Sequence, residues 1–253
     1  MSVLIFAESS NGKYNKATLE VASYAKKIAD QSGTTVTAVA INGGDANELA
    51  AYGVSKVLNV SNGNLSDFNA KAYADTIVQA AEKENANIIV MSSTTDGKYL
   101  APLVAANRNA GYASNVVALP ENMSPLTVKR TAFSNKAFNI TEINSENKVI
   151  AIAKNAYGLH EDSVSVAEEV FDASINDAHL SSKVESVDKV TGKVTIADAE
   201  IVVSAGRGLK GPENWGIIEE LAETLGAATA CSKPVSDLGW RPHSEHVGQT
   251  GKP

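Results

Sequence analysis

Residues 199–221 read AEIVVSAGRGLKGPENWGIIEEL and hold the pattern that decides the fold of this part of the chain. The apolar run at 199–204 predicts a strand, and the period of the apolar residues at 213–225 predicts an amphipathic helix. Pro212 suits the first position of that helix, and Gly226 suits the cap at its end. Three glycines stand between the strand and the helix in a GxGxxG spacing: Gly206, Gly208 and Gly211. A strand, a glycine turn and a helix in this order are typical of dinucleotide-binding α/β folds.

The charged residues around this turn favour an anionic ligand. The dinucleotide pattern requires an acidic residue roughly 20 positions further on, where it binds a ribose hydroxyl. Here the next predicted strand, at 227–231, is followed by Ser232 and Lys233. Arg207, Lys210 and Lys233 would place three cations where the strands end, which favours a phosphate or a reduced anionic ring over a bare ribose. On spacing alone, a tight strand-to-helix turn with solvated basic residues stays open as the alternative.

The last stretch of the sequence, EHVGQTGKP (245–253), contains a Gly-Lys pair but no phosphate-binding P-loop. A P-loop needs an earlier glycine at a fixed distance and a serine or threonine after the lysine, and these positions hold His246 and Pro253. The stretch instead offers Gln249 and Thr250 between glycines. Their neutral donors and acceptors, on an open backbone, could bind the edge of a heteroaromatic ring.

Residues 1–157 alternate predicted strands and helices, which favours βαβ units and a Rossmann-like, mostly parallel sheet. Before residue 157 the spacing tightens to that of antiparallel strands. Strands are expected at 3–7, 35–41, 56–60 and 87–93, and helices at 16–32, 45–53, 69–84 and 98–109.

The alternation stops at Gly158, and this change predicts the domain organisation. Residues 1–157 are expected to form an N-terminal α/β domain, and the polar residues 158–189 are expected to connect it to a second one. Residues 190–253 supply two predicted strands and one helix, too few to bury a core of their own. We therefore expect an incomplete, doubly wound α/β domain there, either cut off within the sequence or completed by another chain.

Composition excludes several classes of protein. The 253 residues include 22 Lys and Arg against 29 Asp and Glu, a net charge of −7, which gives no sign of nucleic-acid binding. The single cysteine, Cys231, excludes an internal disulfide, and His160 and His179 have no cysteine or acidic residue at metal-ligand spacing. The apolar run before Glu8 is too short for a signal peptide, and no stretch is long enough to cross a membrane. We expect a cytoplasmic chain with no metal site and no membrane insertion.

Several longer stretches resemble one known family. VVSAGRGLKGPENWGIIEELAETLGAATACSKPVSDLGW, followed by VGQTGK, resembles the signature of the FAD domain in electron transfer flavoprotein alpha subunits. VLIFAES, DGKYLAPLVAANRNAGYASNVVAL and KRTAFSNKAFN are similar, in order and spacing, to the first domain of that family. The resemblance covers essentially the whole chain and implies an FAD-binding second domain.

The resemblance implies a role for individual residues in binding FAD. Arg207 of the GRG turn and Ser232 match residues that hold FAD. Lys233 stands where an arginine is common in the family, and lysine keeps the charge but lacks the planar guanidinium. The loop expected to run along the flavin, with Thr250 near its redox nitrogen, matches Val247, Gly248, Gln249 and Thr250.

The resemblance also implies a function and partners. In that family FAD takes electrons from primary dehydrogenases, such as the acyl-CoA dehydrogenases of fatty acid β-oxidation, and passes them to a quinone oxidoreductase or another acceptor. The alpha subunit pairs with a beta subunit, on which AMP is expected. The chain is therefore expected to be an electron carrier with no substrate chemistry of its own and no catalytic residue. Because AMP is expected on the beta subunit, we interpret residues 92–98 of this chain as structural.

The end of the sequence leads to one further expectation. Because the family's chain continues past this loop, contacts to the adenosine half of FAD are expected to be missing here. The 253 residues are therefore expected to bind little or no FAD, and the same chain extended through the family's C-terminal segment is expected to bind it stoichiometrically. Two other functions stay open, namely an NAD-dependent oxidoreductase that uses the GxGxxG turn and a structural subunit without a cofactor.

Overall fold

The computed structural model describes residues 2–10, 12–181, 184–186, 195–196 and 199–248. The chain divides into two compact units, and each is described by itself. The first comprises Met1–Ala132 and Lys136–Val184, and the second comprises Phe133–Asn135 and Glu185–Pro253. No helix in the described ranges is both long and apolar enough to span a membrane.

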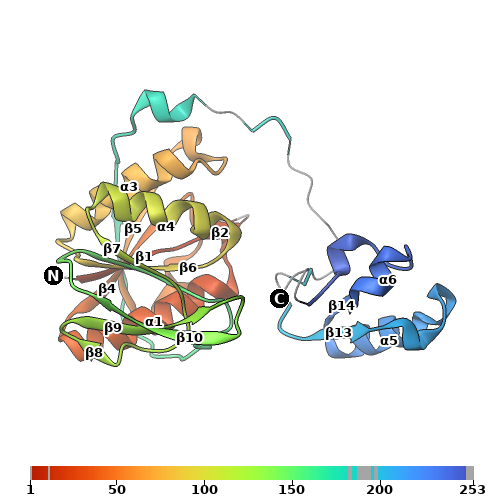
Figure 1. Cartoon of the computed structure of the whole chain (residues 1–253). Helices are drawn as coiled ribbons and strands as arrows, with labels where there is room; N and C mark the ends of the chain where they lie inside the picture. Colours follow the sequence, from red (N-terminus) through yellow and green to blue (C-terminus); the bar gives the residue numbers. More distant parts are fainter. Residues whose placement is uncertain (1, 11, 182–183, 187–194, 197–198, 249–253) are drawn as a thin grey trace. The chain divides into compact units, whose positions relative to one another are not determined.

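The first unit is organised around one large, mostly parallel sheet (Figure 1). Its strand order is β10-β9-β7-β11-β6-β1-β4-β5-β12, with β8 paired to β9. The strands that join the parallel ladders are β1 (Ser2–Phe6), β4 (Thr35–Ile41), β5 (Val54–Val60), β6 (Ile88–Ser92), β7 (Gly111–Val116), β11 (Lys148–Ile152) and β12 (Ala167–Val170). The antiparallel end is made by β8 (Asn122–Met123), β9 (Leu126–Ala132) and β10 (Ala137–Ile143). The Rossmann-like α/β fold with a mostly parallel sheet, expected from the alternation, is confirmed.

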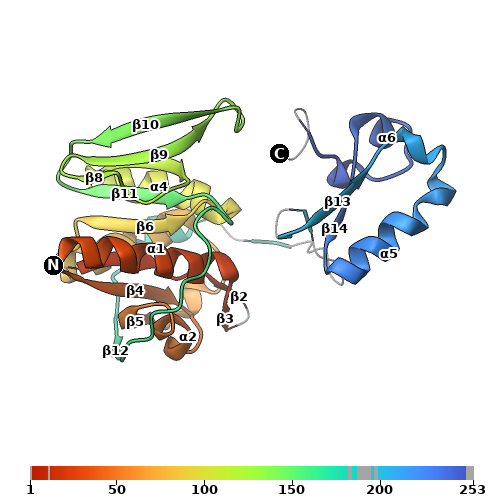
Figure 2. The same cartoon turned by 90° about the horizontal axis from the view of Figure 1, so that it is seen from below.

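Helices cover both faces of this sheet. Helix α1 (Lys16–Ser32) packs on one face, whereas α3 (Ala70–Lys83) and α4 (Thr95–Asn107) cover the other, as Figures 1 and 2 show. Each side has its own apolar core, because alternate strand residues point to opposite faces. Val3 and Ile5 of β1 contribute to the core under α1, and Leu4 contributes to the core under α3 and α4.

Local capping sets where these helices begin and end. The side chain of Asn15 accepts a hydrogen bond from the N–H of Thr18 and so caps α1, and Gly33 ends that helix with a φ of 63°. Thr94 caps α4 through the N–H of Gly97, so that this helix begins at Thr95 and not near Lys98 as expected. Three shorter elements complete this part: β2 (Ser9–Ser10), β3 (Lys13–Tyr14) and α2 (Ala46–Ala50).

The stretch at 158–189, expected to be a connecting segment, differs from that expectation. Residues 167–170 form β12, which pairs in parallel with β5 at the edge of the sheet. The 3₁₀ turns η1 (Gly63–Leu65) and η2 (Asp177–Leu180) lie on the α3 side, where Asn69 Nδ2 donates a hydrogen bond to the carbonyl of His179. Up to Val184 the stretch therefore lies on the first unit, because its backbone and polar side chains find partners there.

A buried glutamate holds the beginning of this stretch. Glu20 of α1 is only 2% exposed, and its carboxylate accepts hydrogen bonds from the N–H groups of Asn155, Tyr157 and Gly158 at 2.7–2.9 Å. Further along, Asp162 lies 3.0 Å from Lys26 Nζ. These three hydrogen bonds offset the desolvation cost of burying the Glu20 carboxylate. They also fix the path of the chain after β11.

The described residues of the second unit form two parallel strands and two helices. They are β13 (Val202–Ala205), α5 (Gly216–Leu225), β14 (Ala228–Cys231) and α6 (Lys233–Asp237), with the 3₁₀ turns η3 (Arg207–Leu209), η4 (Pro212–Asn214) and η5 (His243–Glu245). The strands and the cap at Gly226, with its φ of 62°, agree with the sequence analysis. The helix expected from residue 213 begins instead at Gly216, because Pro212 opens a separate 3₁₀ turn.

A small apolar core holds this unit together. Trp215, Cys231 and Val235 are buried, and Trp240 packs against them. Burial in this core also raises the pKa of the Cys231 thiol. Cys231 is therefore a core residue with a free thiol.

Candidate functional site

Three separate segments meet at the carboxyl ends of β13 and β14, which Figure 2 shows side by side. The strands run in parallel with Ala205 opposite Cys231, and Ser232 N donates a hydrogen bond to the carbonyl of Ala205 at 3.0 Å. The chain then returns, and Val247 N donates to the carbonyl of Cys231 at 3.0 Å. The glycine turn, the residues after β14 and the segment at 246–248 therefore share one edge, where ligands bind in open α/β sheets.

Gly206 and Ser232 form the centre of this edge. A Cβ atom placed on Gly206 would lie 3.6 Å from Ser232 Oγ, and one placed on Gly208 would meet no atom within 4 Å. The space beside the turn is therefore open, and the Ser232 hydroxyl borders it. Within the described residues that hydroxyl has no hydrogen-bond partner, so it is free to bind a ligand.

The turn itself is more ordered than a flexible glycine loop. Arg207–Leu209 form the 3₁₀ turn η3, and the N–H of Lys210 donates to the carbonyl of Arg207. Lys210, and not a glycine, takes the left-handed conformation with a φ of 68°. Asn214 Nδ2 donates to the carbonyl of Leu209 at 2.8 Å and closes the loop. A Cβ atom on Gly211 would overlap only the carboxylate of Glu213, which is the flexible end of a side chain and can move aside.

The three expected cations differ in their surroundings. Arg207 and Lys210 are exposed, and neither has an ion-pair partner among the described residues. Lys233 is also exposed, but its Nζ lies 3.2 Å from the carboxylate of Asp237, one turn further along α6. The edge therefore presents two free cations and one that is already paired, which fits an anionic ligand such as a pyrophosphate.

The remaining predicted residues lie in the returning segment. Val247 is half-buried, and Gly248 is exposed with a φ of 117°, a conformation that favours glycine. Gln249 and Thr250 lie outside the described residues. The described part of the returning segment thus reaches the same edge as Ser232.

The sequence analysis did not identify Arg241, which braces this edge. Arg241 Nε and Nη2 donate to the two carboxylate oxygens of Glu245 at 2.7 and 2.8 Å. Its Nη1 donates to Glu219 on α5 at 2.8 Å, and the guanidinium lies 5.4 Å from the ring centre of Trp215. The four-residue spacing of Arg241 and Glu245 is a signal that could have suggested this pair.

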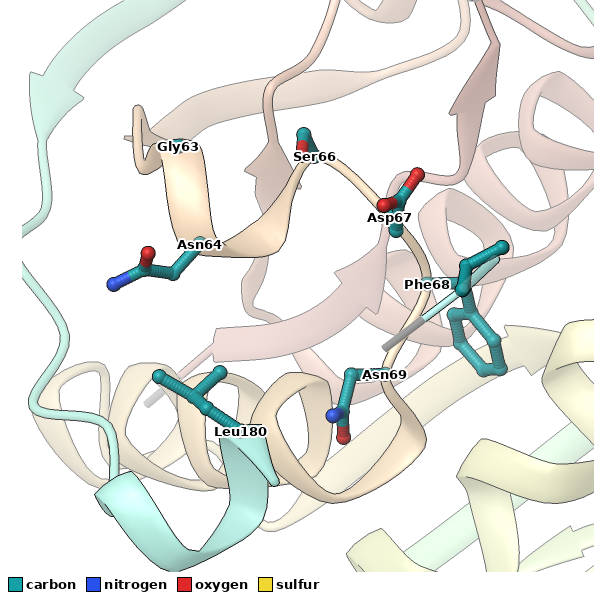
Figure 3. Close-up of a pocket in the computed structure, with 8 residues that line it drawn as sticks. Gly63, Asn64, Ser66, Asp67, Phe68, Asn69 and Leu180 are labelled. Atoms are coloured by element: carbon teal, nitrogen blue, oxygen red, sulfur yellow. The ribbon is translucent and has the colours of Figure 1, made fainter. Parts of the chain in front are cut away.

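The first unit also has a hollow on its surface (Figure 3). It has a volume of about 280 Å³ and lies between η1, the start of α3 and η2, with Leu180 across from Asn64. Asn69 on its wall already caps α3 and binds the carbonyl of His179. None of the residues predicted to bind a cofactor lines it. The described residues also hold no group of three side chains able to bind a metal ion.

Comparison with known proteins gives two family matches. Residues 3–188 match the electron transfer flavoprotein domain, and residues 195–253 match the electron transfer flavoprotein FAD-binding domain. The second match includes the whole edge described above. The two matches together span both units of the chain.

Individual relatives agree with these matches. The electron transfer flavoprotein subunit alpha of Thermoanaerobacterium thermosaccharolyticum is 30% identical over 99% of this chain and 78% of its own length. That of Syntrophomonas wolfei is 29% identical, with 98% and 78% covered. The protein FixB of Clostridium saccharobutylicum is 28% identical, with 99% and 77% covered.

Proposed function

Because this chain belongs to the electron transfer flavoprotein alpha-subunit family, we propose that it binds FAD at the carboxyl ends of β13 and β14 and acts as an electron carrier. The observation that carries the proposal is the open space beside Gly206, bordered by the unpartnered hydroxyl of Ser232. A glycine without a Cβ and a free hydroxyl allow close approach of a ligand to the backbone.

The donors at this edge fit the chemistry of FAD. Arg207 would bind the anionic part of the cofactor, since its guanidinium is exposed and has no partner in the described ranges. Ser232 would donate its hydroxyl, and Val247 and Gly248 would lie along the flavin. Gln249 and Thr250 stay part of the proposal, although they lie outside the described residues. Bound FAD supplies the capacity to take up and release electrons.

Lys233 is proposed to tune the flavin electrostatically. A cation near the ring stabilises its reduced, more negative form and so raises its reduction potential. The ion pair with Asp237 at 3.2 Å moderates this effect, because the carboxylate offsets part of the positive charge. The ion pair of Lys233 with Asp237 would therefore help to set the reduction potential of the flavin.

An alpha subunit implies a heterodimer with an electron transfer flavoprotein beta subunit. AMP on that beta subunit, primary dehydrogenases such as acyl-CoA dehydrogenases as donors, and a quinone oxidoreductase as acceptor complete the proposal. A cytoplasmic location and the absence of substrate chemistry in this chain are parts of it as well.

An FAD titration of the full chain together with its beta subunit tests the proposal. Binding should shift the visible absorption bands of the flavin in a saturable way, and FAD should quench the emission of Trp215 and Trp240, the two tryptophans of the chain. Arg207→Ala and Ser232→Ala should each weaken binding. Absence of saturable FAD binding by the heterodimer would contradict the proposal. The dissociation constant from the same titration tests the expectation that these 253 residues bind little FAD.

The same preparation distinguishes the alternatives. A GxGxxG turn that served an NAD-dependent oxidoreductase would give saturable binding of NAD in place of FAD, although Ser232 and Lys233 stand where an acidic residue would be needed. A structural subunit would bind neither. The titrations with FAD and with NAD together therefore decide between these two functions and the proposed one.

A further inference from the structure

Arg241 contacts four parts of the second unit at once. Its guanidinium donates two hydrogen bonds to Glu245 in η5 and one to Glu219 on α5. It also lies over the ring of Trp215. Nη2 also lies 3.4 Å from Thr229 Oγ1 on β14. The side chain is only 15% exposed, whereas most arginines lie at the surface. A largely buried guanidinium with this many partners fixes the segments around it relative to each other.

The geometry requires arginine and not merely a positive charge. The two parallel bonds to Glu245 use the planar fork of the guanidinium, and its central carbon lies over the Trp215 ring, 5.4 Å from the ring centre. Lysine would keep one ion pair at most and would lose the stacking surface. The hydrogen bond with Glu245 raises the pKa of Arg241, so the group stays charged throughout the accessible pH range.

The four contacts join the two sides of the proposed FAD site. Trp215 follows η4, and Glu219 lies on α5, the helix that comes after the turn of Gly206 and Arg207. Glu245 directly precedes the segment at 246–248, which returns to the end of β14. Between Ser232 and His246 the chain makes a loop whose two ends must meet at this edge, and closing such a loop costs conformational entropy. Arg241 offsets that cost by tying the returning limb to α5 and β14.

We propose that Arg241 is a positioning residue of the FAD site, which holds the segment of Val247 and Gly248 against the turn of Gly206 and Arg207 without contacting the cofactor. This inference rests on the proposed FAD binding. It predicts that the site is preorganised before FAD arrives, and preorganisation raises affinity because fewer groups have to be ordered on binding.

Conservative and matched variants test the inference. Arg241→Lys keeps a charge but loses the fork, and Glu219→Gln and Glu245→Gln each remove one anchor while Arg241 stays. The control is Arg108→Gln in the first unit, because Arg108 is equally buried, with 15% exposure, and binds Glu82, Asn147 and the carbonyl of Ala86. All are measured in the full chain with its beta subunit.

Three readouts separate positioning from simple loss of structure. The emission of Trp215 and Trp240 without FAD reports whether the second unit is folded. The FAD dissociation constant reports the affinity, and the visible circular dichroism of flavin at saturating FAD reports how the ring is placed. Hydrogen exchange of the amides at 246–248 reports the order of the returning limb before FAD binds.

We expect Arg241→Lys to raise the FAD dissociation constant about tenfold or more. It should also speed exchange at 246–248 and change the circular dichroism of bound flavin, while Arg108→Gln changes none of these. If Arg241→Lys does not fold, Glu245→Gln and Glu219→Gln should show the same changes in smaller measure. Unchanged exchange and dichroism in the folded variants would overturn the inference while leaving FAD binding intact. A wild-type heterodimer that binds no FAD would overturn the proposed function as well.

Discussion

The hydroxyl of Ser232 lies against the backbone of Gly206, at 3.6 Å from the position a Cβ atom would take on that glycine. The two residues are 26 positions apart in the sequence. They meet because β13 and β14 run in parallel with Ala205 opposite Cys231. One close approach thus brings the glycine turn and the end of the next strand to a single edge. A substitution that fills the empty space beside Gly206 therefore tests the proposed site directly.

Gly206→Ala should separate ligand binding from folding. Gly206 has a φ of −123°, which alanine adopts freely, and the new methyl group would meet only an ordinary contact with Ser232 Oγ. Urea unfolding should therefore change by no more than about 0.5 kcal/mol. The methyl group would fill the space into which FAD is proposed to fit, so the FAD dissociation constant should rise about tenfold.

Gly226→Ala is the matched control for that variant. Gly226 ends α5 with a φ of 62°, where a side chain costs about 1–2 kcal/mol. It should lower the free energy of unfolding and leave the FAD dissociation constant nearly unchanged in the folded protein. A larger loss of stability in Gly206→Ala than in Gly226→Ala would contradict the assignment of the space beside Gly206.

Lys233 and Asp237 should set the flavin reduction potential together. Lys233→Ala should lower the potential, and Lys233→Arg should keep or raise it, since the charge remains. Asp237→Asn should raise it, because the carboxylate 3.2 Å from Lys233 no longer offsets the positive charge. Spectroelectrochemical titration of the bound flavin measures all three. Equal potentials in these variants would remove the pair from the mechanism.

Glu20 should be important for the stability of the first unit. Glu20→Ala leaves three N–H groups without their acceptor, those of Asn155, Tyr157 and Gly158, and should cost about 3 kcal/mol. Glu20→Gln should cost less, because its amide oxygen still accepts. Urea unfolding followed by far-ultraviolet circular dichroism measures the loss. Tryptophan emission is the internal control, because both tryptophans lie in the second unit, and an equal shift of that signal would argue against a local role.

Acid should weaken the attachment of β12. Hydrogen bonds from Lys56 and Lys83 lower the pKa of Glu169 from 4.5 to about 2. Because the pKa is lower in the folded chain, the stabilisation is complete above pH 4.5 and is lost as the pH falls through about 2. The protection factors of the amides at 167–170, which are exchange rates corrected for the intrinsic effect of pH, should therefore fall between these pH values. In Glu169→Gln the protection should be low already at neutral pH, and an unchanged acid dependence of the protection factors in that variant would exclude Glu169.

Much of the fold could be predicted because it depends on neighbours in the chain. The strands at 35–41 and 228–231, the caps at Gly33 and Gly226 and the start of the glycine turn all follow from short apolar runs and turn residues. Such signals are local, so one sequence contains them in full. The start of α5 was misjudged for the same reason. Pro212 suits both an α-helix and a 3₁₀ turn, and only the packing of Trp215 selected the turn.

Polar segments could not be predicted in this way. Residues 158–189 have no apolar period, and their composition is that of a linker. In the structure β12 pairs with β5, and Glu20 and Lys26 of α1 bind the chain before it. These partners lie far away in sequence, and pairing of backbone groups at a sheet edge needs no side-chain pattern.

The sequence by itself determined the α/β class, the order of strand, glycine turn and helix, and the family to which the chain belongs, because these depend on adjacent residues and on motifs of fixed spacing. Only the tertiary structure decided that Gly206 meets Ser232 and that Arg241 ties η5 to α5. The last contact joins residues 22 positions apart through a guanidinium that is largely buried. Its geometry follows from how helices and turns pack around Trp215, and such packing is a property of the folded chain as a whole.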